Sequence, residues 1–272
     1  MRNYEPELIS VIMGIKYRRS SSELLKRSID SILSQSYKNL ELIICERDST
    51  DSAKALLQEY SAKDPRLQLI DGTAAGSFSE QLNMCLEAAR GAWVARMDDD
   101  DYSYPDRLEK QLAYLKSHPE TAFTGCRCRL VCDGADIGET SMPALPEVRD
   151  FLFSQPFIHP ALLFRRQTLD EVGGYSQLPR CDRCEDYDIL LRIYEKGMKG
   201  SNMDEVLFAY TLPPKGVTSR SFRDRLNEAK TRYARFRSLG LLPRAFPYVV
   251  KPLAVWLIPK RLLSAIKNSR IK

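Results

Sequence analysis

Histidine is scarce in this 272-residue sequence, which contains only His118 and His159, and no G-x-S-x-G motif surrounds any serine. Hydrolases that depend on a serine–histidine pair are therefore disfavoured. The sequence also lacks a G-x-G-x-x-G fingerprint and a G-x-x-x-x-G-K-[ST] loop. These two absences weaken assignment to nucleotide-dependent dehydrogenases or P-loop NTPases.

Long apolar runs are missing as well. None approaches the roughly 20 residues of a spanning helix, and residues 8–15 are too short for a signal peptide. Seven cysteines, an odd number without an export signal, predict reduced thiols in a cytosol. The pair Cys181 and Cys184 is too small to bind zinc alone, and Cys126, Cys128 and Cys132 would have to complete the site. This is disfavoured, because Cys126-x-Cys128 has the alternation of a strand and not the spacing of a zinc knuckle.

The net charge of +5 conceals an uneven distribution. Residues 215–272 hold 15 basic and two acidic residues, whereas the preceding part carries a net charge of −8. We therefore expect an acidic domain over residues 1–212 and a basic helical tail over residues 213–272.

Apolar runs alternate with helical patterns along the first hundred residues. Strands are expected over 8–13, 40–45, 67–70 and 93–97, which predicts βαβ units and a mostly parallel sheet. The pairs Ser20/Glu23 and Ser77/Glu80 have capping-box spacing, and Gly91 stands where a helix would end.

The remaining elements follow from similar signals. A helix is expected after Pro105, a hairpin at Asp133-Gly134 following a strand over 122–132, and a helix over 185–196 ended by Gly197. The segments 147–154 and 161–164 are expected to form a short helix and a strand.

Four consecutive aspartates, Asp98 to Asp101, follow the fourth predicted strand. Ligands of such sheets gather beyond the carboxyl ends of the strands. Because adjacent carboxylates repel, a divalent cation such as Mn²⁺ or Mg²⁺ would stabilise them. The alternative is a solvated turn whose acids cap the next helix.

A second acidic group, Glu185 and Asp186, opens the helix over 185–196. A carboxylate facing a metal–diphosphate site could act as a general base, although acids in this position often only cap the helix. His159, just before a predicted strand, could likewise be structural.

Together these patterns resemble the family 2 glycosyltransferases, which have the GT-A fold. The resemblance runs from about residue 9 to 210, and each segment alone is weak evidence, whereas their order is specific. Its segments are SVIMG (10–14), SIDSILSQSYKNLELIIC (28–45), DSTD (48–51), ARMDDDDYSYPDRLEKQ (95–111), FIHPALLFRRQTLDEVGGY (157–175) and CEDYDILLRIYEKG (184–197).

The resemblance implies an α/β fold of GT-A (Rossmann-like) type, with a mostly parallel sheet flanked by helices and a C-terminal helical appendage. It implies that Asp100, with Asp98, binds Mn²⁺ or Mg²⁺, and that Asp98 or Asp99 contacts the donor. It also implies that Asp186, beside Glu185, is the base of an inverting hexosyl transfer. His159 would lie beside the acceptor and the diphosphate.

The donor end departs from the family pattern at two places. Glu46-Arg47 replaces the usual Asp-Asp after the second strand, and Lys16-Tyr17 replaces Tyr-Asn near Gly14. Arg47 is donor-only and cannot accept the hydrogen bond of a uracil. The resemblance nevertheless implies that Gly14, Tyr17, Glu46 and Arg47 lie at the donor. Either Glu46 reads the base of a UDP-sugar, or the donor carries another base. Tyr17 substitutes for the usual tyrosine after a one-residue shift.

The basic tail has two interpretations. Its cations flank apolar residues such as Trp256, which suits an interfacial element on anionic lipid, but the helices could instead pack against the sheet. No nucleic-acid partner is expected, because no recognised binding module accompanies the charge.

We therefore expect sugar transfer from a nucleotide-sugar to a glycan or lipid-linked glycan hydroxyl in bacterial capsule, exopolysaccharide or O-antigen synthesis. The protein would be cytoplasmic, at the inner face of the cell membrane. The alternatives are a nucleotidyltransferase, with residues 14–19 as a weak phosphate loop, and a membrane-recruited binding protein whose donor site Arg47 blocks.

Overall fold

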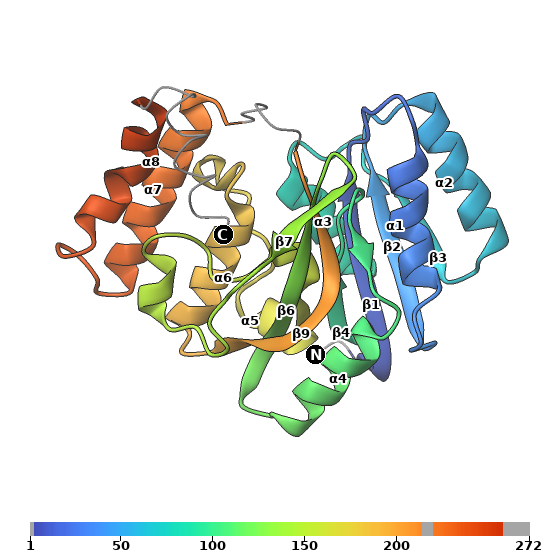
Figure 1. The fold of residues 1–272 in the computed structure, drawn as a ribbon, viewed down its shortest axis with the longest axis horizontal. Coiled ribbons are helices and arrows are strands. Elements are labelled where there is room, and N and C mark those ends of the chain that lie inside the picture. Colours follow the sequence, from blue (N-terminus) through green and yellow to red (C-terminus); the bar gives the residue numbers. More distant parts are fainter. Residues whose placement is uncertain (1–2, 214–219, 258–272) are drawn as a thin grey trace.

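The computed structural model describes residues 3–213 and 220–257. Its strands form one mixed sheet in the order β3-β2-β1-β4-β8-β6-β9-β5, with β7 paired to β6 (Figure 1). The strands are β1 (Glu5–Ile15), β2 (Leu40–Glu46), β3 (Leu67–Asp71), β4 (Gly91–Arg96), β5 (Tyr102–Ser103), β6 (Thr121–Cys132), β7 (Ala135–Glu139), β8 (Leu163–Arg165) and β9 (Lys199–Leu212).

Helices cover both faces of the sheet. They are α1 (Glu23–Leu33), α2 (Asp51–Lys63), α3 (Phe78–Ala88), α4 (Arg107–Ser117), α5 (Arg166–Glu171), α6 (Glu185–Glu195), α7 (Phe222–Ser238) and α8 (Phe246–Leu257). Three short 3₁₀ turns, η1 (Val148–Phe151), η2 (His159–Ala161) and η3 (Pro179–Cys181), lie in the connections.

The first half of the sheet has the predicted parallel arrangement. Strands β3, β2, β1 and β4 pair in parallel, so the carboxyl ends of β1, β2 and β4 lie at one edge. The second half is different: β8 runs antiparallel to β4 and β6, while β6 and β9 are parallel. The sheet is mixed, and the α/β fold with flanking helices is confirmed.

Alternate residues of the central strands enter two separate cores. Val11 and Met13 of β1 pack with α1, α2 and α4, whereas Ile12 faces a core that includes α3 and α6. A strand that is buried on both faces is apolar at nearly every position, because successive side chains point to opposite faces. This explains the apolar run in β1, which only Ser10 interrupts, and the Ser10 hydroxyl donates to the buried Glu41 at 2.6 Å.

Two of the local predictions at helix ends are wrong. Helix α1 begins after Ser22, and no side chain caps it, so the Ser20/Glu23 box does not form. Gly91 starts β4 rather than ending α3. A Cβ at Gly91 would collide with the Leu8 carbonyl oxygen, so the glycine allows β4 to approach β1 closely.

Ser77 is an N-cap, as predicted, and its hydroxyl accepts a hydrogen bond from the Glu80 amide (3.2 Å). The Glu80 carboxylate reaches one residue further back than a capping box requires and accepts from the Gly76 amide. The predicted hairpin at Asp133-Gly134 is confirmed, and both residues have positive φ values, 51° and 78°.

The C-terminal helices pack on the acidic domain. Helix α7 contacts α6 and α8 and lies on the far side of the molecule from α1 and α2 (Figure 1). Its basic residues do not share one face: Arg232 and Arg235 turn inward, whereas Lys230 and Arg237 are exposed. The division at residue 212 stays a prediction, and the predicted membrane-facing residues beyond 257 lie outside the described part.

No helix in residues 3–213 or 220–257 combines the length and apolar character needed to traverse a bilayer.

A buried ion pair joins α6 to α7. Asp188 is fully buried and accepts hydrogen bonds from Arg192 and Arg235, both at 2.8 Å. Replacing Asp188 with asparagine should lower the free energy of unfolding by about 3 kcal/mol, because Arg192 loses the counter-charge of Asp188 and Arg235 is left with that of Glu195. Urea denaturation would measure this, with the exposed Lys230→Gln as control; equal midpoints for Asp188→Asn and wild type would contradict the expectation.

Candidate active site

The acidic loop starts where β4 ends. Asp98 lines an open cleft of about 680 Å³, and its carboxylate accepts a 2.5 Å hydrogen bond from the buried Arg96. The Ser28 hydroxyl of α1 donates to the Asp98 carbonyl at 2.7 Å. These contacts fix the loop, so that the Asp98 side chain lies at the sheet edge where the parallel strands end.

Asp99 and Asp100 are partly buried beside Asp98. Burial, with the charges of Asp100 and Asp98, raises the pKa of the Asp99 carboxyl to about 7. Burial and Asp98 also raise the pKa of Asp100, whose carboxylate accepts a 2.5 Å hydrogen bond from Arg19. Burial is the larger cause of both shifts, and repulsion between the neighbouring carboxylates adds to it.

Asp101 has a structural position. It is fully buried, and its Oδ1 accepts a 2.7 Å hydrogen bond from the Thr211 amide of β9. The Thr211 hydroxyl donates to the Asp100 carbonyl at 2.6 Å. Burial and the neighbouring acids raise the pKa of Asp101 well above its usual value. Strand β9 therefore holds the acidic loop together with α1, whose Arg27 also donates to the Asp100 carbonyl at 2.9 Å.

The acidic loop could supply some of the oxygen ligands of a divalent cation, and a bound phosphate could supply others. Mg²⁺ and Mn²⁺ favour carboxylate oxygens and are often held by one or two carboxylates plus substrate phosphates. Asp98 and Asp100 offer such oxygens, and the excess charge of the loop favours a cation. Within the described residues, no three histidine, cysteine or acidic side chains converge as a complete metal site. The loop alone is thus a partial site.

The predicted base lies across the same cleft. Glu185 and Asp186 open α6 and line the cleft together with Asp98. Burial and the Asp186 charge raise the pKa of Glu185 to about 7. Burial also raises the pKa of Asp186, while its bond to the Tyr187 amide (2.7 Å) and the charge of Arg220 lower it. The fold thus brings together residues that are 88 positions apart.

Cations line the cleft as well as acids. Lys16 and Arg47 follow β1 and β2, and Arg183, Arg220 and Arg223 come from the C-terminal side. Cations on both sides of a cleft suit the oxygens of a diphosphate. The cleft therefore combines carboxylates, which suit a cation or a proton, with cations, which suit phosphate oxygens.

Arg47 follows β2 and is held in place where it lines the cleft. Its guanidinium donates to the Ala75 carbonyl and lies 3.8 Å from Asp48. The Glu46 carboxylate accepts from the Ser49 amide at 2.7 Å and lines a separate pocket near α2 and β3. Of the two residues that replace the usual Asp-Asp, Arg47 alone lines the main cleft, within the described part of the chain.

Gly14 and Tyr17 lie behind the cleft instead of in its lining. A Cβ at Gly14 would meet the Phe78 ring at 3.0 Å, so the glycine permits close packing against α3. Tyr17 is 2% exposed, and its hydroxyl donates to the Ser21 carbonyl at 2.8 Å. Their predicted donor contacts stay predictions.

His159 is buried below the site, with 6% of its surface exposed. Its Nε2 lies 3.1 Å from the Tyr175 hydroxyl. Burial and the charge of Arg96 lower its pKa well below the usual value, so the ring is neutral at pH 7. The role of His159 beside the acceptor and diphosphate stays a prediction, and the geometry gives it a partner in Tyr175.

Sequence analysis missed four residues that shape the site. Tyr210 lines the cleft, Arg96 binds Asp98, Thr211 holds the acidic loop, and Arg19 binds Asp100. A buried arginine inside an otherwise apolar strand was the available signal for Arg96. Tyr210 and Thr211 lie in β9, which was not predicted.

The pH dependence of catalysis should reveal the environment of Asp186. A base must be deprotonated, so activity should fall on the acid side, below a pKa that burial raises above the ordinary aspartate value. Replacing Arg220 with glutamine removes a charge that lowers this pKa, so the acid limb should move to higher pH. Rates of donor hydrolysis between pH 4 and 9 would measure the shift, and an unmoved limb would contradict it.

The sequence profile described as "Glycosyl transferase family 2" matches residues 10–174. EpsE of Bacillus subtilis (strain 168), which is named as a glycosyltransferase, is 34% identical over 97% of this chain and 94% of its own length. The O-antigen biosynthesis glycosyltransferase WbnJ of Escherichia coli is 32% identical over 78% of this chain and 82% of its own length.

A solved structure shares the fold. The mannosyltransferase PcManGT of Pyrobaculum calidifontis, in complex with GDP-Man and Mn²⁺, superposes with a TM-score of 0.62 at 20% identity. The match covers 98% of this chain and 80% of that one. The resemblance in ordered motifs, the profile match and the full-length relatives agree, and the chain belongs to glycosyl transferase family 2.

Proposed function

We propose that this enzyme transfers a sugar from a nucleoside-diphosphate-sugar to a hydroxyl group of a glycan acceptor, with inversion at the anomeric carbon. The observation that supports it best is the shared cleft. Asp98, which follows β4, and Asp186 of α6 both line it. Lys16 and Arg47, which follow β1 and β2, line it as well. Membership of the family supports the same reaction class.

Different residues of the cleft would bind the metal, bind the donor and accept the proton. Asp98 and Asp100 would hold Mn²⁺ or Mg²⁺, and such a cation, when bound, neutralises charge on a leaving diphosphate. Lys16 and Arg47 would bind the phosphates and the base end of the donor. Asp186 accepts the proton of the acceptor hydroxyl, and Glu185 beside it raises the basicity of the pair by like-charge repulsion.

The acceptor that we propose is a lipid-linked glycan, in the assembly of a bacterial surface polysaccharide at the inner face of the membrane. The O-antigen role named for WbnJ supports this setting. Exposed apolar residues on α8, among them Phe246 and Trp256, would lie against anionic lipid. The alternative is a membrane-recruited binding protein whose donor site is blocked by Arg47, and the position of Arg47 in the cleft lining supports it.

The stereochemistry of donor hydrolysis tests the proposal without an identified acceptor. Water replaces the acceptor when UDP-glucose, UDP-N-acetylglucosamine or GDP-mannose, which are all α-linked, is supplied with Mn²⁺. Time-resolved proton NMR should detect the β anomer of a released sugar first. Release of the α anomer first, or of no sugar from any of these donors, would contradict inverting transfer.

A further inference from the structure

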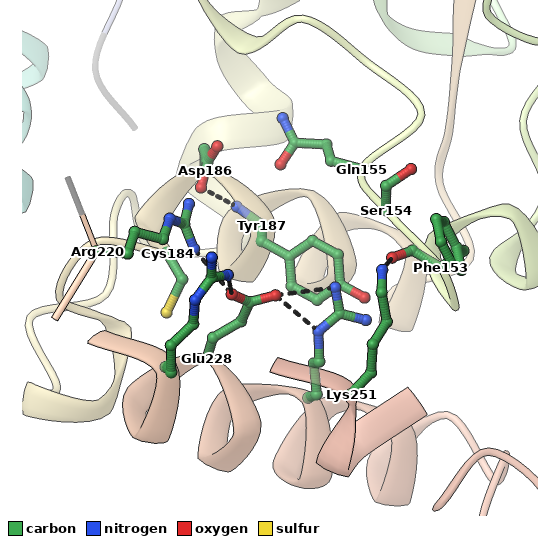
Figure 2. A pocket seen from close by; sticks show the side chains of 11 residues that line it. Phe153, Ser154, Gln155, Cys184, Asp186, Tyr187, Arg220, Glu228 and Lys251 are labelled. Carbon is green, nitrogen blue, oxygen red and sulfur yellow. Dashed lines mark hydrogen bonds and ion pairs between the residues drawn. The ribbon is translucent and has the colours of Figure 1, made fainter. Parts of the chain in front are cut away.

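Asp186 borders a second pocket of about 230 Å³ in addition to the main cleft (Figure 2). Arg220 also lines both spaces. The second pocket lies between α6, α7, Lys251 of α8 and the segment 153–155. A ligand in this pocket would approach the Asp186 carboxylate from outside the nucleotide-binding cleft.

The second pocket carries an excess of positive charge. Four cationic side chains and only two carboxylates, Asp186 and Glu228, line it. Three guanidinium groups share the single Glu228 carboxylate, which accepts from Arg220 at 2.8 Å, Arg225 at 3.3 Å and Arg232 at 3.1 Å (Figure 2). One carboxylate cannot neutralise three guanidinium groups, so the pocket favours an anionic ligand.

Polar and aromatic groups in the pocket suit a sugar. The Gln155 Oε1 atom is buried and has no hydrogen-bond partner in the described part of the chain, so it could accept from a ligand hydroxyl. The Phe153 ring is 49% exposed, and the Lys251 ammonium lies over it, 3.4 Å from the ring centre, and donates to the Phe153 carbonyl. The volume matches one sugar ring or a phosphate group with its first sugar, rather than an oligosaccharide.

We infer that this pocket is an acceptor subsite for a phosphate-linked sugar, whose phosphate binds Arg225 and Lys251 while its hydroxyl faces Asp186. The inference rests on the proposed function. In the reaction, Asp186 takes the hydroxyl proton as the acceptor oxygen bonds to the anomeric carbon. The bond from that carbon to the donor phosphate breaks, and its electrons leave with the nucleoside diphosphate.

The phosphate could belong to a soluble sugar phosphate or to a lipid-linked sugar. Val250 and Leu257 lie on α8, the helix that carries Lys251, and are 39% and 74% exposed. A hydrocarbon chain attached to the phosphate could lie along these residues. Both kinds of ligand carry the phosphate, but only the lipid-linked sugar carries a hydrocarbon chain. Probes with and without such a chain therefore distinguish them.

Calorimetric titrations of the full chain would test the subsite, with the main cleft saturated by Mn²⁺ and its preferred nucleoside diphosphate. The probes are N-acetylglucosamine 1-phosphate, the neutral methyl glycoside of the same sugar, inorganic phosphate and farnesyl phosphate. We expect the sugar phosphate to bind at least about tenfold more tightly than the methyl glycoside. Farnesyl phosphate binding more tightly than inorganic phosphate would indicate a lipid-linked acceptor, and equal binding a soluble one.

A pair of double variants isolates the charge in the pocket. Arg225→Gln/Lys251→Gln should weaken binding of the sugar phosphate at least about tenfold. Lys230→Gln/Arg237→Gln removes the same charge from exposed positions of α7 and should change it less than about twofold. Both should keep wild-type thermal unfolding and nucleotide affinity.

Two results would overturn the inference alone: no binding of the sugar phosphate to the nucleotide-saturated protein, or equal binding by the Arg225→Gln/Lys251→Gln variant and wild type. Failure of every nucleoside diphosphate to bind the protein would instead refute the proposed function and the inference with it.

Discussion

Replacing Asp186 with asparagine is expected to reduce the turnover of a bound nucleotide-sugar about 10³-fold, because a general base contributes on this order. Nucleotide affinity should stay within about twofold of wild type, since an amide keeps the size of the side chain. Donor hydrolysis and calorimetry on the same preparation would measure both quantities. The environment of Asp186, partly buried with a raised pKa, is that of a carboxylate suited to take a proton.

The control for Asp186→Asn is Asp204→Asn, which removes one carboxylate whose side chain is 91% exposed on β9. It should leave turnover unchanged. Retained turnover in Asp186→Asn would remove this residue as the base and direct attention to Glu185, which shares the cleft.

Replacing Asp98 with asparagine should abolish the enhancement of nucleotide binding by Mn²⁺. The amide is a weaker ligand for a hard cation than a carboxylate, and Asp98 is the acid of its loop that lines the cleft among the described residues. We expect affinity in Mn²⁺ to fall at least about tenfold, and affinity without metal to change little. Calorimetry in Mn²⁺ and in a chelator would separate the two.

Asp101→Asn is the matched comparison within the same loop. An asparagine keeps the oxygen that accepts from the Thr211 amide, and burial already disfavours the charge of Asp101. This variant should keep metal-enhanced binding within about threefold. Equal losses in Asp98→Asn and Asp101→Asn would mean that the loop acts as a general negative field, and not through a specific ligand.

The parallel half of the fold could be predicted because its signals are local. Residues 8–13 and 40–45 are apolar except for Ser10 and Glu41, which bond to each other, since both faces of β1 and β2 are buried. Strand β9 gave no such signal. Asp204 and Glu205 interrupt it where its pairing with β6 shifts, between Cys126↔Met203 and Arg127↔Val206, so that the apolar pattern breaks.

The site could be predicted only as far as its chemistry lies in contiguous motifs. Asp98 and Asp186 were identified from the acidic groups that follow a strand and open a helix, and the fold places them on one cleft. The contacts that hold the acidic loop could not be predicted, because Thr211 comes from a strand 110 residues further along the chain. Tyr17 and Glu46 do not line the cleft: the Tyr17 side chain is buried, and Glu46 lines a separate pocket.

The central claim is that the cleft between β4 and α6 binds a nucleoside diphosphate together with a divalent cation. Calorimetric titration with UDP, GDP, dTDP and CDP, each with and without Mn²⁺, tests it most directly. The account predicts that at least one of them binds, at least about tenfold more tightly with Mn²⁺ than without it. Binding of none of the four in Mn²⁺ would contradict the account.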